Sequence, residues 1–296
     1  MNNRKISRVL KSQPTIEGAG VHLKRAFGNA NVNLLDPFLL LDDFHSDNPD
    51  DYIAGFPWHP HRGIETVTYM LHGNVKHEDS LGNGGVIEPG DVQWMTAGSG
   101  IVHSEMPQQT NGLLRGLQLW VNLPSSHKMM DPRYREVKNE QIPEISLKNG
   151  IKIKIISGEV EGTRGPVRDI VVDIQYLDVT VPSGAECEYP ISKGYTAFAY
   201  VLAGAGYFDE VKEKRIDEDH LVIFTDGDKI KITADDASML VRFLLISGKP
   251  LREPVAWYGP IVMNTQEELQ LAFEEYQKGT FIKHKVDGVH IDGGIK

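Results

Sequence analysis

Two histidines separated by a single proline give the clearest indication of chemistry in this sequence. His59 and His61 stand in the run Phe56-Pro57-Trp58-His59-Pro60-His61. Side chains at positions i and i+2 of an extended strand share one face, so both imidazoles can reach the same ion. Pro60 is excluded from a helix interior and favours extended backbone. We therefore predict a strand that supplies two nitrogen ligands to one metal ion.

A second pair of ligand-type residues follows the same spacing rule. His103 and Glu105 come directly after the glycine-rich run Gly98-Ser99-Gly100, again two residues apart. If the two strands face each other in a barrel, three neutral imidazoles and one carboxylate converge. Such a set leaves open positions on an octahedral ion for water, substrate or dioxygen. We predict a mononuclear metal site made of His59, His61, His103 and one glutamate, for which Glu105 is a candidate.

The residues alone do not decide which carboxylate binds the ion or which metal it is. Glu65 has the same parity as His59 and His61, so it could be the carboxylate ligand instead, or it could orient an imidazole. Nitrogen ligands with one oxygen suit Fe(II), Mn, Co, Ni, Cu or Zn. The remaining histidines stand alone, and we interpret them as surface or structural residues, although His45 and His77 have acidic neighbours.

The aromatic side chains near these pairs allow two interpretations. They could form the wall of a pocket for a planar ligand, but strand aromatics are more often part of the core, which is the interpretation we prefer. They are Phe44, Phe56, Trp58, Trp94 and Trp120. Arg62 could attract an anionic substrate, and a salt bridge at the rim of a barrel is the interpretation we favour.

The elements that must position these residues are predicted to be β-strands. Short apolar stretches separated by Gly, Pro, Asn and Asp recur along the chain, which is typical of an all-β protein. The run from Leu117 to Leu123 alternates aliphatic with larger or polar residues, as a half-buried strand does. A C-terminal helix is the exception: Thr265 and Glu268 form a capping-box sequence, and Gly279 ends the apolar stripe.

The length of 296 residues predicts two domains, because it exceeds the usual size of one hydrophobic core. The charged segment 129–143 is the best candidate for the connection. We predict an N-terminal domain at 1–135, which contains the metal site, and a C-terminal domain at 136–296, which includes the helix. The two halves resemble a worn repeat, since Tyr69-Met70-Leu71-His72-Gly73 has an echo in Tyr200-Val201-Leu202-Ala203-Gly204.

Charge and cysteine content restrict the partners and the compartment. The net charge of -10 should repel phosphate backbones, so we expect no direct binding of nucleic acid. The lone Cys187 excludes an intramolecular disulfide and fits a reducing compartment. Neither a signal peptide nor an apolar run long enough to cross a bilayer is evident. We expect a cytoplasmic protein without a membrane segment.

Three motifs together resemble the pirin family. They are the histidine segment, the run from Pro89 to Pro107 that contains Thr96-Ala97-Gly98-Ser99-Gly100-Ile101-Val102-His103-Ser104-Glu105, and Leu117-Gln118-Leu119-Trp120-Val121-Asn122-Leu123. The resemblance implies a bicupin, with two tandem jelly-roll β-barrels. It also implies iron or a similar ion, Fe(II) being favoured, held in the first barrel by His59, His61, His103 and Glu105. In the second barrel the repeat sets Pro190 and Ser192 opposite the histidine pair and Ile232 opposite His103, so the C-terminal domain at 136–296 is expected to be metal-free.

The resemblance implies two functions of different class. Some pirins open the central ring of the flavonol quercetin with dioxygen and release carbon monoxide, whereas animal members act as iron-dependent nuclear co-regulators of transcription. We favour a quercetin 2,3-dioxygenase that takes a small planar aromatic substrate and O2, with Glu105 as ligand and as base for the 3-hydroxyl proton. The alternative is a redox-sensing regulator that binds a protein partner, such as a transcription factor or a metabolic enzyme.

Overall fold

The computed structural model describes residues 2–108, 112–284, 286 and 289. The chain forms two compact units, which are described separately. Residues 14–32, 38–139 and 251–296 make up the histidine unit, and residues 1–13, 33–37 and 140–250 make up the second unit. The all-β prediction is confirmed, since strands dominate both units. The predicted domain boundary at 135 and 136 stays a prediction.

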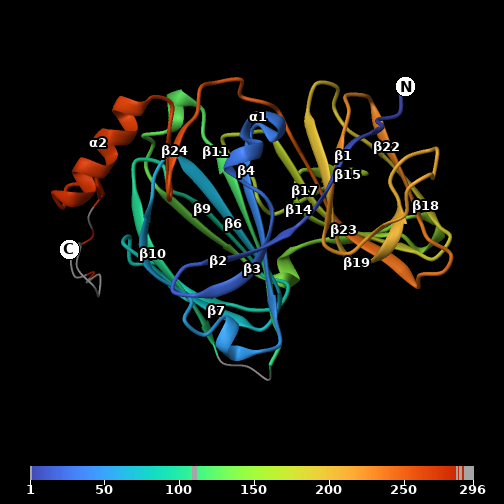
Figure 1. The fold of residues 1–296 in the computed structure, drawn as a ribbon, viewed down its shortest axis with the longest axis horizontal. Helices are drawn as coiled ribbons and strands as arrows, with labels where there is room; N and C mark the ends of the chain where they lie inside the picture. Colours follow the sequence, from blue (N-terminus) through green and yellow to red (C-terminus); the bar gives the residue numbers. More distant parts are fainter. Residues whose placement is uncertain (1, 109–111, 285, 287–288, 290–296) are drawn as a thin grey trace. The chain divides into compact units, whose positions relative to one another are not determined.

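The histidine unit is built from two sheets. The larger sheet has the strand order β12-β9-β6-β11-β4-β3-β2, and the smaller one β5-β10-β7-β8; Figure 1 shows β9, β6, β11 and β4 as neighbours. The strands are β2 (Gln13–Glu17), β3 (Val21–Phe27), β4 (Phe38–Ser46), β5 (Phe56–His61), β6 (Ile64–His72), β7 (Asn74–Asp79), β8 (Gly84–Ile87), β9 (Val92–Thr96), β10 (Ile101–Gln108), β11 (Leu114–Asn122) and β12 (Arg133–Val137).

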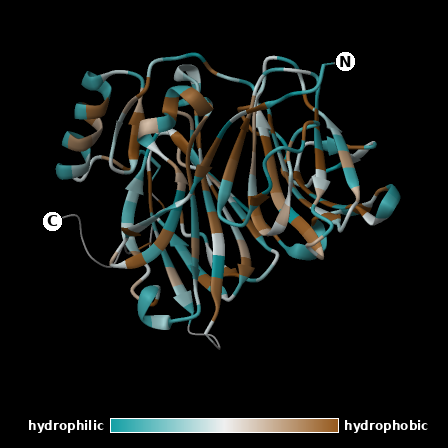
Figure 2. Cartoon of the chain, turned by 45° about the vertical axis from the view of Figure 1, so that its right-hand side comes forward, coloured by the Kyte–Doolittle hydropathy of each residue, from teal (hydrophilic) through white to brown (hydrophobic). Residues whose placement is uncertain are grey.

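The C-terminal segment of the histidine unit contains the predicted helix. A hairpin of β24 (Ala256–Tyr258) and β25 (Ile261–Met263) leads into α2 (Gln266–Gln277). Thr265 caps the helix and exchanges hydrogen bonds with Glu268, so the predicted capping box is confirmed. The helix carries both hydrophilic and hydrophobic residues (Figure 2). Its buried residues are Leu269 and Ala272. Within the described part of the chain, no helix is long and apolar enough to span a membrane.

The second unit has a sheet with the main order β1-β21-β19-β23-β17-β14-β13, to which β18, β20 and β22 attach. Its interior is filled by aliphatic and aromatic side chains, among them Val179, Phe208, Phe243 and Ile232. The strands are β1 (Ile6–Lys11), β13 (Glu144–Ser146), β14 (Lys152–Ser157), β15 (Glu159–Val160), β16 (Thr163–Arg164), β17 (Ile174–Pro182), β18 (Glu186–Pro190), β19 (Thr196–Tyr207), β20 (Ile216–Asp217), β21 (His220–Phe224), β22 (Lys229–Ala234) and β23 (Leu240–Gly248); α1 (Val32–Leu35) is a short helical turn.

The strand orders support the predicted repeat and correct its register. β6 lies between β9 and β11 in one sheet, and β19 lies between β21 and β23 in the other. Ile232 is the repeat equivalent of His103. It pairs with Cys187, just as His103 pairs with His59, so Cys187 is the equivalent of His59. Pro190 and Ser192 are exposed, so the predicted match of these two residues to the histidine pair is wrong. The difference in residue number between equivalent positions of the two repeats is not constant, because the segments between equivalent strands differ in length.

Candidate metal centre

The edge of the smaller sheet brings the predicted histidines together. β10 pairs with β5 in antiparallel register, so that His103 lies directly opposite His59, while Glu105 lies opposite Phe56. Between these two pairs, β10 advances by two residues and β5 by three. The extra residue forms a β-bulge in β5. Bulges re-aim side chains, and they are frequent beside functional sites. Here the bulge falls within the histidine segment itself.

The three imidazoles face one another closely. The ring centroids of His59 and His103 lie 4.3 Å apart, those of His59 and His61 4.9 Å, and those of His61 and His103 5.0 Å. One nitrogen from each ring can be chosen so that all three nitrogens lie within 4.8 Å of one another. Such a cluster can hold one metal ion. The three histidines thus meet in one place, and their role as metal ligands stays a prediction.

Hydrogen bonds to the backbone define which nitrogens are free to bind an ion. His59 Nδ1 donates to the carbonyl of Pro57 at 2.8 Å, and His61 Nδ1 donates to that of Pro260 at 3.0 Å. In a neutral imidazole the other nitrogen then carries a lone pair. The two Nε2 atoms lie 3.2 Å apart and are both acceptors, an arrangement that a bound cation between them would relieve.

The third histidine of the cluster also has ring nitrogens that are free to bind an ion. His103 is fully buried, and neither of its ring nitrogens has a hydrogen-bond partner among the described residues. Buried polar groups without partners are costly, so each calls for an explanation such as a bound ion or water. The donor set of His59, His61 and His103 therefore fits a transition metal.

Burial keeps the three imidazoles neutral, as metal binding requires. Desolvation lowers the pKa of His59, against the opposing charge of Glu105. Burial, followed by the charge of His59, lowers the pKa of both His61 and His103 well below the ordinary range. An imidazole that is neutral near pH 7 offers its lone pair without first losing a proton.

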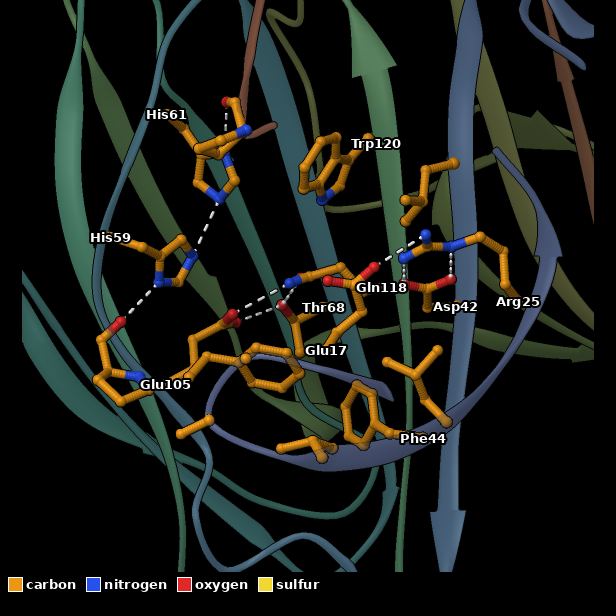
Figure 3. A pocket seen from close by; sticks show the side chains of 18 of the residues that line it. Glu17, Arg25, Asp42, Phe44, His59, His61, Thr68, Glu105, Gln118 and Trp120 are labelled. Atoms are coloured by element: carbon orange, nitrogen blue, oxygen red, sulfur yellow. Dashed lines mark hydrogen bonds and ion pairs between the residues drawn. The ribbon is translucent and has the colours of Figure 1, made fainter. Parts of the chain in front are cut away.

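Glu105 lies on the wall next to the histidines and is held by two polar side chains. Thr68 Oγ1 donates to Glu105 Oε1 at 3.0 Å, and Gln118 Nε2 donates to Oε2 at 3.0 Å (Figure 3). Thr68 and Gln118 come from neighbouring positions of β6 and β11, on the sheet that faces β10. Neither residue was predicted from the sequence. The predicted roles of Glu105 as fourth ligand and base stay predictions.

Glu65 occupies a different environment from the one its parity suggested. A turn at Gly63, with φ at +77°, separates β5 from β6, so the alternation does not continue from His61. Glu65 accepts a hydrogen bond from Thr96 Oγ1 at 2.7 Å, and burial raises the pKa of its carboxyl. It is not among the residues that line the cavity beside the histidines.

A further histidine lies behind the cluster. His77 is fully buried on β7, and its Nε2 lies 3.3 Å from Asp79 Oδ2. Its ring stacks on Tyr134 at 5.0 Å and lies 5.3 Å from that of His103. A surface position for His77 is therefore excluded, whereas a structural role fits its contacts. Its proximity to the cluster follows from strand pairing, in which it lies opposite Glu105.

The C-terminal segment fixes the backbone next to His61. Lys128 Nζ donates to the carbonyls of Gly63 and Val262 at 2.9 and 3.0 Å, which ties the turn after the histidine pair to β25. Arg62 points away from the cluster, forms an ion pair with Glu275 at 2.8 Å and lies over the ring of Phe281. The salt-bridge interpretation of Arg62 is thus confirmed.

A cavity of about 580 Å³ opens beside His59 and His61 and includes Glu105, Thr68 and Gln118 in its wall. Four of the five aromatic residues singled out in the sequence line it, namely Phe44, Phe56, Trp58 and Trp120. Trp94 is buried and does not line it. All four also belong to hydrophobic core clusters or pack against them, so the preferred core interpretation and the pocket-wall interpretation both hold for these residues. The volume is within the range of small-molecule sites, roughly 300–1,000 Å³.

Comparisons with known proteins agree with this geometry. The Pirin family profile matches residues 20–121, and the profile of the Pirin C-terminal cupin domain matches residues 176–282. A pirin-like protein from Caulobacter vibrioides is 46% identical over 94% of this chain and 99% of its own length. The pirin of Homo sapiens is 42% identical over 93% of each chain.

A solved structure extends the comparison to the fold. The crystal structure of a quercetin 2,3-dioxygenase from Acinetobacter baumannii superimposes with a TM-score of 0.86 and 32% identity, and the match covers 95% of this chain and 99% of that one. Two cupin domains followed by a short C-terminal helix are thereby confirmed. With both family profiles matched in order and close relatives aligned over almost their full length, this chain belongs to the pirin family.

Proposed function

We propose that this protein is a metal-dependent quercetin 2,3-dioxygenase, which opens the central ring of a flavonol with O2 and releases carbon monoxide. One observation carries the proposal. The facing lone pairs of His59 and His61 open onto a cavity in which the carboxylate of Glu105 is held in place. The name of the similar Acinetobacter baumannii structure supports it.

His59, His61 and His103 would hold the ion, with Glu105 as a fourth ligand, and Fe(II) is the ion we favour. The ion would supply Lewis acidity and labile positions for substrate and dioxygen. The protein's part is to present neutral imidazoles in a fixed arrangement. The backbone hydrogen bonds of His59 and His61 set that arrangement by fixing the tautomers.

Glu105 would take the proton of the flavonol 3-hydroxyl, because it is the carboxylate that borders both the histidines and the cavity. Loss of that proton makes the ring electron-rich and so open to attack by oxygen. Thr68 and Gln118 each hold one carboxylate oxygen, and they would keep Glu105 oriented toward the cavity. General base catalysis of this kind typically contributes about 10²–10⁴-fold to the rate.

Trp120 would orient the substrate. Its indole Nε1–H is buried and has no hydrogen-bond partner among the described residues, while its ring meets the edge of His61 at 5.0 Å. A flavonol carries a ketone oxygen next to its 3-hydroxyl, which could accept that hydrogen bond. The rings of Phe44 and Phe56 would cover the planar substrate and exclude water.

Oxygen consumption with quercetin tests the proposal. The purified protein is stripped of metal, reloaded with Fe(II), Mn, Co, Ni, Cu or Zn, and compared with Glu105→Gln. Glu65→Gln is the matched control, because Glu65 is also a buried strand glutamate bonded to a threonine, yet lies outside the cavity. We expect turnover in the wild type and the control, and a loss of about 10²-fold or more in Glu105→Gln.

A different result would favour the alternative function. If every metal form holds its ion and consumes no oxygen with quercetin, the dioxygenase proposal is wrong. A redox-sensing regulator that binds a protein partner would then become the leading account.

A further inference from the structure

The cavity has a second polar group at a distance from the histidines. Arg25 on β3 donates from Nε and Nη2 to the two carboxylate oxygens of Asp42 on β4, at 2.8 and 2.7 Å. Its Nη1 lies 3.0 Å from Glu17 Oε1 at the end of β2. All three residues line the cavity, on the side away from His59 and His61 (Figure 3). We call Glu17, Arg25 and Asp42 the distal group.

The distal group has a definite charge and a definite hydrogen-bonding character. One guanidinium between two carboxylates leaves a net negative charge. The side chain of Asp42 is 8% exposed, whereas those of Arg25 and Glu17 are 27% and 44% exposed and can be reached by a ligand. Carboxylate oxygens accept hydrogen bonds and guanidinium N–H groups donate them. A neutral hydroxyl, which does both, matches this group, and an anion would be repelled.

The walls between the two polar ends are apolar. They include Leu23, Leu40, Phe44 and Trp120, which offer flat and aliphatic surface. A ligand that fits the whole cavity therefore has an apolar planar body, one end that reaches the histidines, and neutral hydroxyls at the other end. Fixed polar groups in a mostly apolar pocket are what give such sites their specificity.

We propose that the distal group selects substrates by binding the outlying hydroxyls of a neutral polyhydroxylated aromatic, those remote from the hydroxyl at the metal end. This inference rests on the proposed function, since it places the reacting ring beside the histidines. Glu17 accepts from the outlying hydroxyl and Arg25 donates to it. Hydrogen bonds to charged groups of this kind change affinity by about 10- to 100-fold.

Ligand binding, and not turnover, tests the proposal. The metal-loaded protein is titrated anaerobically with quercetin, with 3-hydroxyflavone, and with a quercetin sulfated on an outlying hydroxyl, and the quenching of tryptophan fluorescence is recorded. 3-Hydroxyflavone keeps the metal-end group and lacks every outlying hydroxyl. We expect quercetin to bind at least tenfold more tightly than either analogue.

Variants of Glu17 identify the residue responsible. Glu17→Leu should reduce the preference for quercetin over 3-hydroxyflavone to within about threefold, because the acceptor is lost. Glu17→Gln should improve binding of the sulfated analogue by several-fold, because a negative charge is removed. Glu144→Gln is the control, since Glu144 lies on β13 of the second unit, and it should leave all three affinities unchanged. Metal content and melting temperature verify that each variant is folded.

The outcomes separate this inference from the proposed function. Equal binding of quercetin and 3-hydroxyflavone by the wild type, or an unchanged preference in Glu17→Leu, overturns the role of the distal group even if quercetin is turned over. The expected preference without oxygen consumption supports the distal group and sinks the dioxygenase. Failure of all three ligands to bind overturns both.

Discussion

His59 Nε2 and His61 Nε2 lie 3.2 Å apart, although the Nδ1 atom of each ring already donates a hydrogen bond to a backbone carbonyl. Two neutral imidazoles in these tautomers direct lone pairs at each other. The arrangement is unfavourable without a cation and favourable with one. A cation at this point would accept both lone pairs while the backbone hydrogen bonds keep the two rings in place.

Removing a histidine of the cluster should abolish metal binding. We expect His103→Leu to lose its ion after dialysis, because two nitrogens remain where three converged. The wild type should gain roughly 2.7 kcal/mol of stability when free metal is at 100 times its Kd, and the variant should gain none. His72→Ala is the control, since His72 is exposed at the end of β6. Metal analysis and thermal melting measure both effects, and full metal content in His103→Leu would contradict the assignment.

The stability of the metal-free protein should depend on pH below 6.5. Burial lowers the pKa values of His59, His61 and His103 in the folded chain, whereas in the unfolded chain they return to about 6.5. Below pH 6.5 the unfolded state therefore binds more protons than the folded state. The free energy of unfolding decreases as the pH falls, until the lowered pKa values of the folded state are reached.

Urea denaturation at several pH values between 8 and 5 measures this dependence. His103→Leu should show a shallower fall than the wild type, because one of the buried imidazoles is gone. An equal fall in both proteins would show that His103 does not take part. The folded, metal-free protein should also lose less metal affinity between pH 8 and 6 than ordinary histidine ligands would, because the lowered pKa values leave fewer protons to displace.

Thr68 should matter for turnover more than for folding. Thr68→Val removes the hydroxyl that donates to Glu105 and keeps the shape of the side chain. Loss of such a supporting hydrogen bond typically costs about 10- to 100-fold in activity or metal affinity. Thr96→Val is the matched control, because Thr96 is buried and donates to Glu65 outside the cavity. Steady-state kinetics with quercetin compare them, and equal rates in the two variants would remove Thr68 from the mechanism.

Gly63 should tolerate no side chain, because it forms the turn directly after the histidine pair. A Cβ there would lie 1.9 Å from the carbonyl oxygen of Val262, and its φ is +77°. Gly162 has a similar φ of +80°, but a Cβ at that position meets nothing within 4 Å. Gly162→Ala should cost about 1 kcal/mol for the backbone conformation alone.

Gly63→Ala should cost roughly 1–3 kcal/mol more than Gly162→Ala, because β25 must move away from the turn. The displacement should also weaken metal binding, because His61 Nδ1 donates a hydrogen bond to the carbonyl of Pro260, which directly precedes β25. Chemical denaturation and metal titration of both variants check this. Equal losses of stability would show that the turn accommodates the methyl group.

Much of the site could be predicted because its strongest signals are local. The spacing of His59 and His61, and of His103 and Glu105, fixes which side chains share a face within one strand. The capping box at Thr265 is also a local signal. Prediction succeeded where neighbours in sequence determine the geometry.

The rest depends on pairing between distant strands. Thr68 and Gln118 meet Glu105 only because β6 and β11 face β10, and no spacing rule connects them. Glu65 was considered as a ligand on the assumption that one strand continues from His61 through Gly63. The chain turns at Gly63 instead, so the alternation of side chains does not continue. The distal group joins three further strands. Cytoplasmic location, the identity of the ion and a protein partner stay predictions.

The proposed ring cleavage is tested by trapping carbon monoxide during quercetin turnover. The Fe(II)-loaded protein is supplied with quercetin and O2, and the gas released is measured together with the oxygen consumed. We expect the proposed dioxygenase activity to produce carbon monoxide and consume oxygen in equal amounts, and Glu105→Gln to show about 10²-fold less of both, or lower still. Oxygen uptake without carbon monoxide, or no uptake by a protein that holds its ion in the three-histidine cluster, would contradict it.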